Sequence, residues 1–403
     1  MEERRTLAAA GLFAGIGGIE LGLGAAGHRT SMLCEIDPHA SRVLQAHFPK
    51  IPLEPDVRRI DALPADVDLV VAGFPCQDLS QAGRTAGING GRSGLVSQVF
   101  RLIEGAAERP RWLLLENVSF MLHLDRGQGM RYLTSELERM GMRWAYRVVD
   151  SRAFGLPQRR QRVLLLASSV ADPGPLLFEQ EAGEPVEQEY EGKANGFYWT
   201  EGLRGLGWAV DAVPTLKGGS TIGIPSGPAI WLPDGRIVTP GIRAQERLQG
   251  FEPDWTLPGV LGEKRHGPRW KMVGNAVSVP VARWIGERLA LEPAAAEYPT
   301  SPLADGAPWP RAAQGGPGMA REAVDRSMWP IRTPRPHLVD FLEGDATPLS
   351  VKACDGFLSR AARSGLNFPP GLLDAIRAHR AAPGPRSCAA CRTPSPGGPL
   401  LTT

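Results

Sequence analysis

Residues 7–21 of the chain read LAAAGLFAGIGGIEL. In this stretch an apolar run ends at a turn that contains Gly15 and Gly17, and a helix-like run begins directly after the turn. A glycine turn at the carboxyl end of a buried strand lets the backbone approach a ligand closely. The segment therefore predicts the first strand, turn and helix of an α/β sheet, with a binding site at the turn.

The same alternation continues outward to about residue 168. Strands are predicted at residues 31–35, 68–73, 112–117, 144–150 and 162–168, and helices at residues 37–47, 95–108 and 130–140. Strands that are apolar on both faces and alternate with helices predict a mostly parallel sheet that is covered on both sides. We therefore expect residues 1–168 to form a doubly wound, Rossmann-like α/β domain.

The pattern changes after residue 168. Residues 172–191 are acidic and are expected to form an exposed linker, whereas residues 193–240 are rich in Gly, Pro and Trp and predict short strands and turns. Helical runs return at residues 243–248 and 276–289. The region before 241 is thus expected to be a small, mostly β or irregular domain.

The last part of the chain is rich in proline. Residues 291–403 hold 17 of the 37 prolines, and we expect residues 291–335 and 381–403 to be flexible tails. Residues 349–379 contain enough Leu, Phe and Ala to predict one or two small helices.

The composition limits the classes of function. Of the 403 residues, 42% are hydrophobic and 22% charged, which is typical of a globular protein. No apolar run approaches the roughly 20 residues of a membrane span, and the N-terminus lacks the apolar core of a signal peptide, so we expect a cytoplasmic protein. The five cysteines predict no disulfide framework, and the isolated pair Cys388 and Cys391 offers too few ligands for a structural zinc.

An acid follows the glycine turn at an informative distance. Glu35 ends the second predicted strand, 20 residues after Gly15, where a carboxylate can accept both ribose hydroxyls of a nucleoside. Glu20 stands where a dinucleotide motif has its third glycine, which disfavours a pyrophosphate. With Asp56 facing an adenine amino group, the pattern fits S-adenosylmethionine, and the alternative is an ordinary tight turn.

Two chemically useful side chains are expected at neighbouring strand ends. Cys76 lies in GFPCQDLS (73–80) and suits a thiolate nucleophile, although a free cysteine is more often a small buried hydrophobe. Glu116 lies in WLLLENV (112–118), where burial raises the pKa of a carboxyl group, although it could also be a solvated strand end. Together they can attack C6 and protonate N3 of a pyrimidine that has left the duplex.

A basic run precedes the last predicted strand of this domain. Residues 158–163 read QRRQRV, and Arg160 and Arg162 lie two apart, so they are expected on one face, with Arg159 on the other. The pair could reach the O2 of a base, a nucleotide phosphate or a thiolate. The alternative is a solvated basic run.

Taken in order, these stretches resemble the motifs of the bacterial and viral DNA (cytosine-5)-methyltransferase family. The matching stretches are LFAGIGG (12–18), GFPCQ (73–77), ENV (116–118), QRRQRV (158–163), RLQGF (247–251) and GNAVSVPVA (274–282). The resemblance covers residues 7–168 and 241–289 and lacks one family feature, because Ala244 stands where a glutamate is common.

The resemblance implies a role for each matched residue. Catalytic roles fall to Cys76, Glu116, Arg160 and Arg162, and contacts to S-adenosylmethionine fall to Phe13, Gly15, Gly17, Glu35, Asp56, Pro75, Asn275 and Val277. The helix that carries Asn275 and Val277 is expected to return beside the glycine turn. Residues 1–168 and 241–290 would then form the methyltransferase domain, and residues 291–403 a Pro-rich extension without an assigned role.

On the DNA side, the resemblance implies a mobile loop at residues 81–95 and a target-recognition domain at residues 169–240. The expected DNA contacts are Ser80, Arg84, Arg92, Arg204, Lys217 and Arg236. Four aromatic side chains either contact DNA or pack in the core of this domain: Phe197, Tyr198, Trp199 and Trp208.

The function implied is methyl transfer to C5 of a flipped-out cytosine in a short duplex DNA site, through a cysteine adduct at C6. A monomer would suffice. The expected setting is protective methylation or a restriction–modification system, whose endonuclease need not form a stable complex. Two alternatives stay open: an RNA cytosine-5 methyltransferase and a non-catalytic DNA-binding regulator. Comparing duplex DNA with tRNA, and wild type with Cys76→Ser, separates them.

Overall fold

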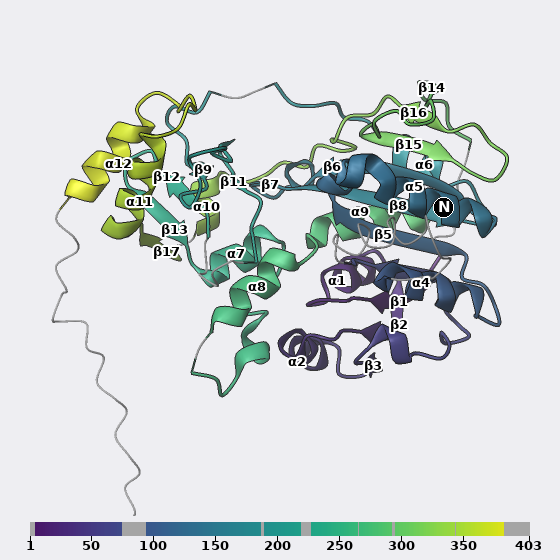
Figure 1. Ribbon diagram of the computed structural model, residues 1–403. Coiled ribbons are helices and arrows are strands. Elements are labelled where there is room, and N and C mark those ends of the chain that lie inside the picture. The colour runs from purple at the N-terminus through teal and green to yellow at the C-terminus, as the bar shows by residue number, and fades with distance from the viewer. Residues whose placement is uncertain are drawn as a thin grey trace, which may run out of the picture.

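The computed structural model describes residues 5–74, 94–186, 189–218, 227–264, 266–291, 295–342 and 344–382. The chain forms a large lobe around a ten-stranded sheet and a small lobe around a five-stranded sheet. Figure 1 shows the two lobes side by side, with β7, β11 and α7 between them. No helix among the described residues is both long and apolar enough to cross a bilayer.

The central sheet has the order β14-β16-β15-β6-β8-β5-β4-β1-β2-β3. Its first seven strands along the chain are β1 (Ala8–Leu12), β2 (Arg29–Cys34), β3 (Leu53–Glu54), β4 (Leu69–Ala72), β5 (Trp112–Val118), β6 (Arg143–Asp150) and β8 (Gln161–Ser168). The five neighbouring strands β5, β4, β1, β2 and β3 are parallel to one another, whereas β8 runs antiparallel to both β5 and β6. Six of these seven strands therefore run in one direction and β8 is reversed, so the mostly parallel sheet that we expected is confirmed for this part of the sheet. The connection from β6 to β8 is too short for the crossover that a parallel pair needs.

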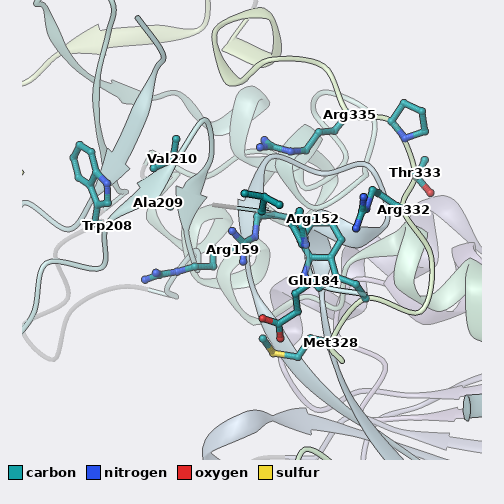
Figure 2. A pocket seen from close by; sticks show the side chains of 14 residues that line it. Arg152, Arg159, Glu184, Trp208, Ala209, Val210, Met328, Arg332, Thr333 and Arg335 are labelled. Atoms are coloured by element: carbon teal, nitrogen blue, oxygen red, sulfur yellow. The ribbon is translucent and has the colours of Figure 1, made fainter. Parts of the chain in front are cut away.

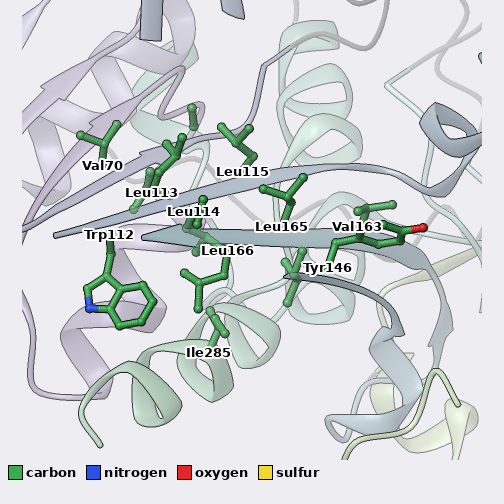
Figure 3. Close-up of a cluster of buried hydrophobic side chains, with 14 of the residues drawn as sticks. Val70, Trp112, Leu113, Leu114, Leu115, Tyr146, Val163, Leu165, Leu166 and Ile285 are labelled. Atoms are coloured by element: carbon green, nitrogen blue, oxygen red, sulfur yellow. The ribbon is translucent and has the colours of Figure 1, made fainter. Parts of the chain in front are cut away.

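Helices complete this α/β fold. Those of the large lobe are α1 (Gly18–Ala25), α2 (Pro38–His47), α4 (Leu95–Glu104), α5 (Gln128–Arg139), α6 (Gly174–Phe178) and α9 (Val279–Leu289). The core lies against β4, β5 and β8, where apolar side chains are buried along whole strands (Figure 3). Helix α9 returns from far along the chain to pack on α1, and a Cβ on Gly22 would lie 2.5 Å from the Cβ of Ala282. Only glycine allows this approach.

The small lobe has its own sheet and core. Its strands, in the order β10-β9-β12-β13-β17, are β9 (Asn195–Phe197), β10 (Ala209–Val210), β12 (Ala229–Trp231), β13 (Ile237–Pro240) and β17 (Ala346–Pro348). Two helices, α11 (Val351–Ala361) and α12 (Leu372–Ala381), form the small helical patch that we expected in residues 349–379. They contribute Phe357 and Ile376 to a core that also holds Phe197.

Between the lobes lie short elements. These are β7 (Gln158–Arg159), β11 (Val213–Pro214), α7 (Ile242–Leu248), α8 (Gly267–Asn275) and α10 (Leu338–Leu342). The strands β7 and β11 pair in parallel and link the basic run of the large lobe to the small lobe.

The expectation of a flexible tail at residues 291–335 is wrong. This segment forms β14 (Thr300–Pro302), β15 (Ala312–Gly315) and β16 (Glu322–Val324), and β15 pairs antiparallel with β6. The indole of Trp309 donates a hydrogen bond to the carbonyl of Gly127 at 3.0 Å and anchors the segment. A proline-rich composition argues for disorder only where no partner is available, and β6 supplies one here.

The acidic residues 172–191 are also less exposed than expected. The short helix α6 is buried, and Glu181 forms an ion pair of 2.7 Å with the fully buried Arg147. Glu179 pairs with Arg288 of α9. Arginines from other parts of the large lobe thus hold this segment on its surface.

One buried carboxyl group lies behind the glycine turn. Glu20 of α1 is 4% exposed, and it packs so closely on β1 that a Cβ on Gly11 would collide with it. Its Oε2 has no hydrogen-bond partner. Burial, with a smaller contribution from the charge on Glu35, raises the pKa of Glu20 from 4.5 to about 7.

We predict that Glu20 makes the stability of the fold depend on pH. Between pH 4.5 and about 7 the unfolded chain loses this proton and the folded chain keeps it, so the free energy of unfolding falls as the pH rises. The fall amounts to about 3 kcal/mol and then levels off. Urea denaturation across this range should show that Glu20→Gln removes the dependence.

Glu287→Gln is the matched control, because Glu287 is an exposed partner of Arg283 on α9. If wild type, Glu20→Gln and this control all show the same pH dependence, Glu20 is not protonated in the folded protein.

Candidate active site

A cavity of about 320 Å³ lies at the carboxyl ends of the first strands of the central sheet. It is lined by the first turn, by the ends of β2 and β4, and by α8. The predicted cofactor residues among its walls are Phe13, Gly15, Glu35, Asp56 and Asn275. One cavity thus collects side chains that lie more than 250 positions apart in the sequence.

The first turn is fixed by its backbone and by Glu35. Gly15 and Gly17 have φ of +59° and +82°, and even Phe13 has φ of +58°. The amide of Gly15 donates to Oε2 of Glu35 at 2.8 Å, and the amide of Asp37 donates to Oε1 at 2.7 Å. Burial raises the pKa of Glu35, while these two amides oppose the change. Each carboxylate oxygen keeps a further lone pair for a ligand.

Asp56 contributes a lasting negative charge to the same cavity. The guanidinium of Arg58 lies 2.6 Å from its carboxylate and, by hydrogen bonding, lowers the pKa of Asp56 to about 2. Asp56 also caps the short turn that follows β3. The acid is therefore ionised at any working pH.

The return segment differs in detail from the single helix that we expected. Asn275 is the last residue of α8 and lines the cavity, but Val277 lies between α8 and α9 and is not among the lining residues. The carbonyl of Val277 instead packs on Gly18 of α1, where a Cβ would lie 2.5 Å from it. Val277 therefore supports the glycine turn from behind.

Glu116 lies beside Arg162 at the ends of β5 and β8. The Nε of Arg162 is 2.9 Å from Oε1 of Glu116, and both side chains are about nine-tenths buried. The ion pair leaves Oε1 without a well-aligned hydrogen bond. Burial raises the pKa of Glu116, and the charges of Arg162 and Arg160 limit the rise. The site therefore holds a carboxyl group that can keep or release a proton.

The chain that leads to Cys76 begins next to this carboxyl group. The side-chain amide of Asn117 donates to the carbonyl of Phe74 at 2.9 Å, and a Cβ on Gly73 would lie 3.6 Å from Oε2 of Glu116. Asn117 was not singled out in the sequence, where its only signal is its place directly after Glu116. The described residues stop at 74, so Cys76 itself lies outside them.

The predictions for Pro75, Ser80, Arg84 and Arg92, and for most of the loop 81–95, also fall in residues 75–93, outside the described residues.

Arg160 takes a different place from the one expected. We expected its guanidinium to face the base or the nucleotide, but it is fully buried and donates to three carbonyl oxygens. These belong to Leu216 (3.2 Å), Gly274 (3.2 Å) and Ala276 (2.6 Å). Arg160 therefore joins the segment that leads into the small lobe to the end of α8, which lines the cavity.

The predicted DNA contacts of the small lobe have mixed surroundings. Lys217 pairs with Glu201 and lies 3.7 Å from the ring centre of Tyr198, Arg236 pairs with Asp234 at 2.7 Å, and Arg204 is exposed. Of the aromatic candidates, Phe197 is fully buried in the core of the small lobe, and Trp199 and Trp208 pack against that core.

Comparison with known proteins identifies the family. The profile of the C-5 cytosine-specific DNA methylases matches residues 7–188. Over 385 residues the chain is 48% identical to the Type II methyltransferase M2.BsuMI of Bacillus subtilis, with 91% of this chain and 96% of that protein covered. This chain belongs to the C-5 cytosine-specific DNA methylase family.

Other members of this methylase family are more distant. The Type II methyltransferase M.NgoBI of Neisseria gonorrhoeae is 30% identical over 291 residues, which cover 67% of this chain and 89% of that one. The solved structure of the methyltransferase EhMeth of Entamoeba histolytica shares the fold, with a TM-score of 0.51 at 14% identity, over 71% of this chain and 98% of that one. The protein is a DNA cytosine-5 methyltransferase.

We predict that Arg160→Ala destabilises this methyltransferase strongly. Among the described residues the change leaves the carbonyl oxygens of Leu216 and Gly274 without a side-chain donor, while that of Ala276 keeps only a long bond of 3.4 Å from the side-chain amide of Gln249. Because each buried acceptor without a donor costs about 1–3 kcal/mol, we expect a loss of at least about 2 kcal/mol in urea denaturation. Arg283→Ala removes an exposed arginine that pairs with Glu287 and should change stability by less than about 0.5 kcal/mol. Equal effects of the two variants would contradict a structural role for Arg160.

Proposed function

We propose that this methyltransferase transfers the methyl group of S-adenosylmethionine to C5 of a cytosine that is flipped out of duplex DNA. The observation that carries the proposal is the buried pair of Glu116 and Arg162, which lies beside the chain that leads to Cys76 and near the cavity at the first turn. An acid, a nucleophile and a cofactor pocket at one end of the sheet are what methyl transfer to C5 requires.

The lining of the cavity fits a nucleoside without phosphate groups. Glu35 offers carboxylate oxygens for ribose hydroxyls, and Asp56 and Asp37 add negative charge. The one lysine in the lining, Lys271, is already paired with Asp37 at 3.1 Å. Such a set of donors and acceptors disfavours a dinucleotide, and it tolerates the positive charge of a sulfonium. When bound, S-adenosylmethionine supplies an electrophilic methyl group.

The chemistry of the chain follows from the two proposed catalytic groups. The Cys76 thiolate forms a bond to C6 of cytosine, and Glu116 donates a proton to N3, so that electron density collects at C5. C5 then takes the methyl group. Loss of the C5 proton to a base and departure of the thiolate restore the C5–C6 double bond, and N3 returns its proton to the carboxylate of Glu116. Arg162 keeps the Glu116 carboxyl group in position through Oε1.

The remaining assignments complete the proposal. We propose that the small lobe reads one short DNA site, with the expected contacts at Arg204, Lys217 and Arg236. The enzyme acts as a monomer in the cytoplasm, and a cognate restriction endonuclease shares its recognition site without a stable complex.

We predict that Cys76→Ser abolishes methylation in cells. Wild type, Cys76→Ser and the control Cys354→Ala are expressed in a bacterial host without cytosine methylation, and the host DNA is mapped by bisulfite sequencing. Cys354 lies in the core of the small lobe, so its loss removes a thiol that has no part in the reaction. Protected cytosines should lie in one short motif in wild type and in the control, and should be absent in Cys76→Ser.

Protection that persists in Cys76→Ser would exclude Cys76 as the nucleophile. If wild type gives no protection either, duplex DNA is not the substrate, and tRNA is the next to test.

We predict that Glu116→Gln slows methyl transfer about 100- to 10,000-fold, because the amide keeps the shape of the side chain but cannot donate the proton to N3. The raised pKa of Glu116 keeps the acid form to a higher pH than an ordinary carboxyl group. The rate of wild type should therefore fall as the pH rises through this pKa, and single-turnover transfer of labelled methyl should show no such fall in Glu116→Gln. A rate within about tenfold of wild type would mean that another group supplies the proton.

A further inference from the structure

A second cavity lies away from the cofactor pocket. It has a volume of about 510 Å³ and shares no lining residue with that pocket. Its walls come from five segments: the turn after β6, the end of β7, the acidic connection, β10, and the C-terminal chain on its way to the small lobe. Four arginines line it, Arg152, Arg159, Arg332 and Arg335. Figure 2 shows them around one space, with Trp208 at one side and Arg332 at the other.

The positive charges of this arginine pocket are only partly neutralised. Arg152 forms a bidentate pair with the buried Asp150 at 2.9–3.0 Å. Arg335 lies 3.8 Å from the carboxylate of Asp211, which His337 also contacts. The carboxylate of Glu184 also lines the pocket, but it pairs with Arg311 at 2.8 Å.

The other two arginines have no carboxylate partner among the described residues. Within that part of the chain Arg332 donates to the carbonyl oxygens of Ala182 and Gly183, each at 3.2 Å. The guanidinium of Arg159 has neither an ion pair nor a hydrogen bond with any described residue, although the side chain is only partly exposed. Unpaired guanidinium groups in a partly buried place are costly unless a ligand satisfies them.

Repulsion adds to this cost. The charge of Arg152 acts on both Arg159 and Arg335 and, after burial, is the largest influence that lowers the pKa of Arg159. The short elements on which these residues lie hold the like charges together. An anion in the pocket would relieve the repulsion and would find guanidinium groups in the walls as hydrogen-bond donors.

The walls also suit the rest of a nucleotide. Trp208 and Trp329 both line the pocket, and Trp329 packs beneath the guanidinium of Arg152, 5.6 Å from its ring centre. Aromatic faces beside arginines are the usual surroundings of a base that is attached to a phosphate.

We propose that the arginine pocket is a second, non-catalytic site that binds a phosphate group carried by a nucleotide. Arg159 is the last residue of β7 and Arg160 follows it directly. The guanidinium of Arg160 donates to carbonyl oxygens at the end of α8, beside the cofactor pocket, whereas Arg159 lines the arginine pocket. The phosphate has two sources with the same chemistry: the backbone of DNA outside the methylated site, or a free nucleotide.

The test compares Arg159→Gln/Arg332→Gln with the control Arg283→Gln, which removes an exposed arginine from α9. Glutamine keeps much of the length of the side chain, and circular dichroism with thermal unfolding verifies that each variant folds. Calorimetry measures the binding of inorganic phosphate and of adenosine 5′-monophosphate. Fluorescence anisotropy measures the binding of a short duplex that spans only the target site and of a duplex extended on both sides, across a series of salt concentrations.

Each source gives its own result. If a free nucleotide is the ligand, the double variant binds adenosine 5′-monophosphate at least about tenfold more weakly than the control, and both duplexes bind as in the control. If the DNA backbone is the ligand, the double variant loses affinity for the extended duplex only, and the slope of log affinity against log salt falls by about one to two.

The proposal is overturned if the double variant and the control bind phosphate, nucleotide and both duplexes equally. A second result would also overturn it. In that result the double variant binds the short and the extended duplex more weakly than the control by the same factor, and binds the nucleotide as the control does. The arginines would then belong to the target-site interface. Neither outcome bears on methyl transfer by Cys76 and Glu116, which is assayed separately at saturating DNA.

Discussion

The guanidinium of Arg160 is the interaction on which the arrangement of this methyltransferase depends. It is fully buried, and its three acceptors belong to two distant parts of the chain, residue 216 and residues 274–276. One side chain thus joins the basic run of the large lobe, the segment that leads into the small lobe and the helix end that lines the cofactor pocket. A carbonyl oxygen that is left buried without a donor costs free energy, so separating any of these three parts from the others is unfavourable.

The neighbouring arginine has the opposite task. Arg162 donates to the carbonyl of its neighbour Gln161 and pairs with the carboxyl group of Glu116. Burial of the pair raises the pKa of Glu116, where an ordinary ion pair at the surface would lower it. Of two arginines that are two positions apart, Arg160 therefore holds parts of the structure together, and Arg162 contacts the carboxyl group proposed to donate a proton. The sequence pattern QRRQRV does not distinguish these roles, since a spacing of two predicts both side chains on one face, whereas Arg160 lies between β7 and β8 and only Arg162 lies in a strand.

How far the sequence predicts this protein depends on what decides each feature. Buried apolar runs such as β4 and β5 are predicted to within about a residue because their composition is set by the core. The link between Gly15 and Glu35 follows from a spacing that one βα unit imposes. In contrast, β14 to β16 have three or four residues each, too few for a periodic pattern, and the exposed edge of β6 decides that they form. The acceptors of Arg160 lie 56 to 116 positions away, so nothing local reveals them.

The C-terminal chain has one more consequence, for the modularity of the enzyme. Its strand β17 pairs with β13, and α11 and α12 supply part of the core of the small lobe, so this lobe is assembled from two pieces separated by the return segment of the large lobe. The 48% identity to M2.BsuMI covers 91% of the chain and so includes most of the C-terminal piece. A graft of residues 169–240 alone would leave a foreign sheet facing the resident helices. A transplant of the small lobe, the DNA-reading part in our proposal, therefore requires both pieces, with residues 338–382 moved together with the first.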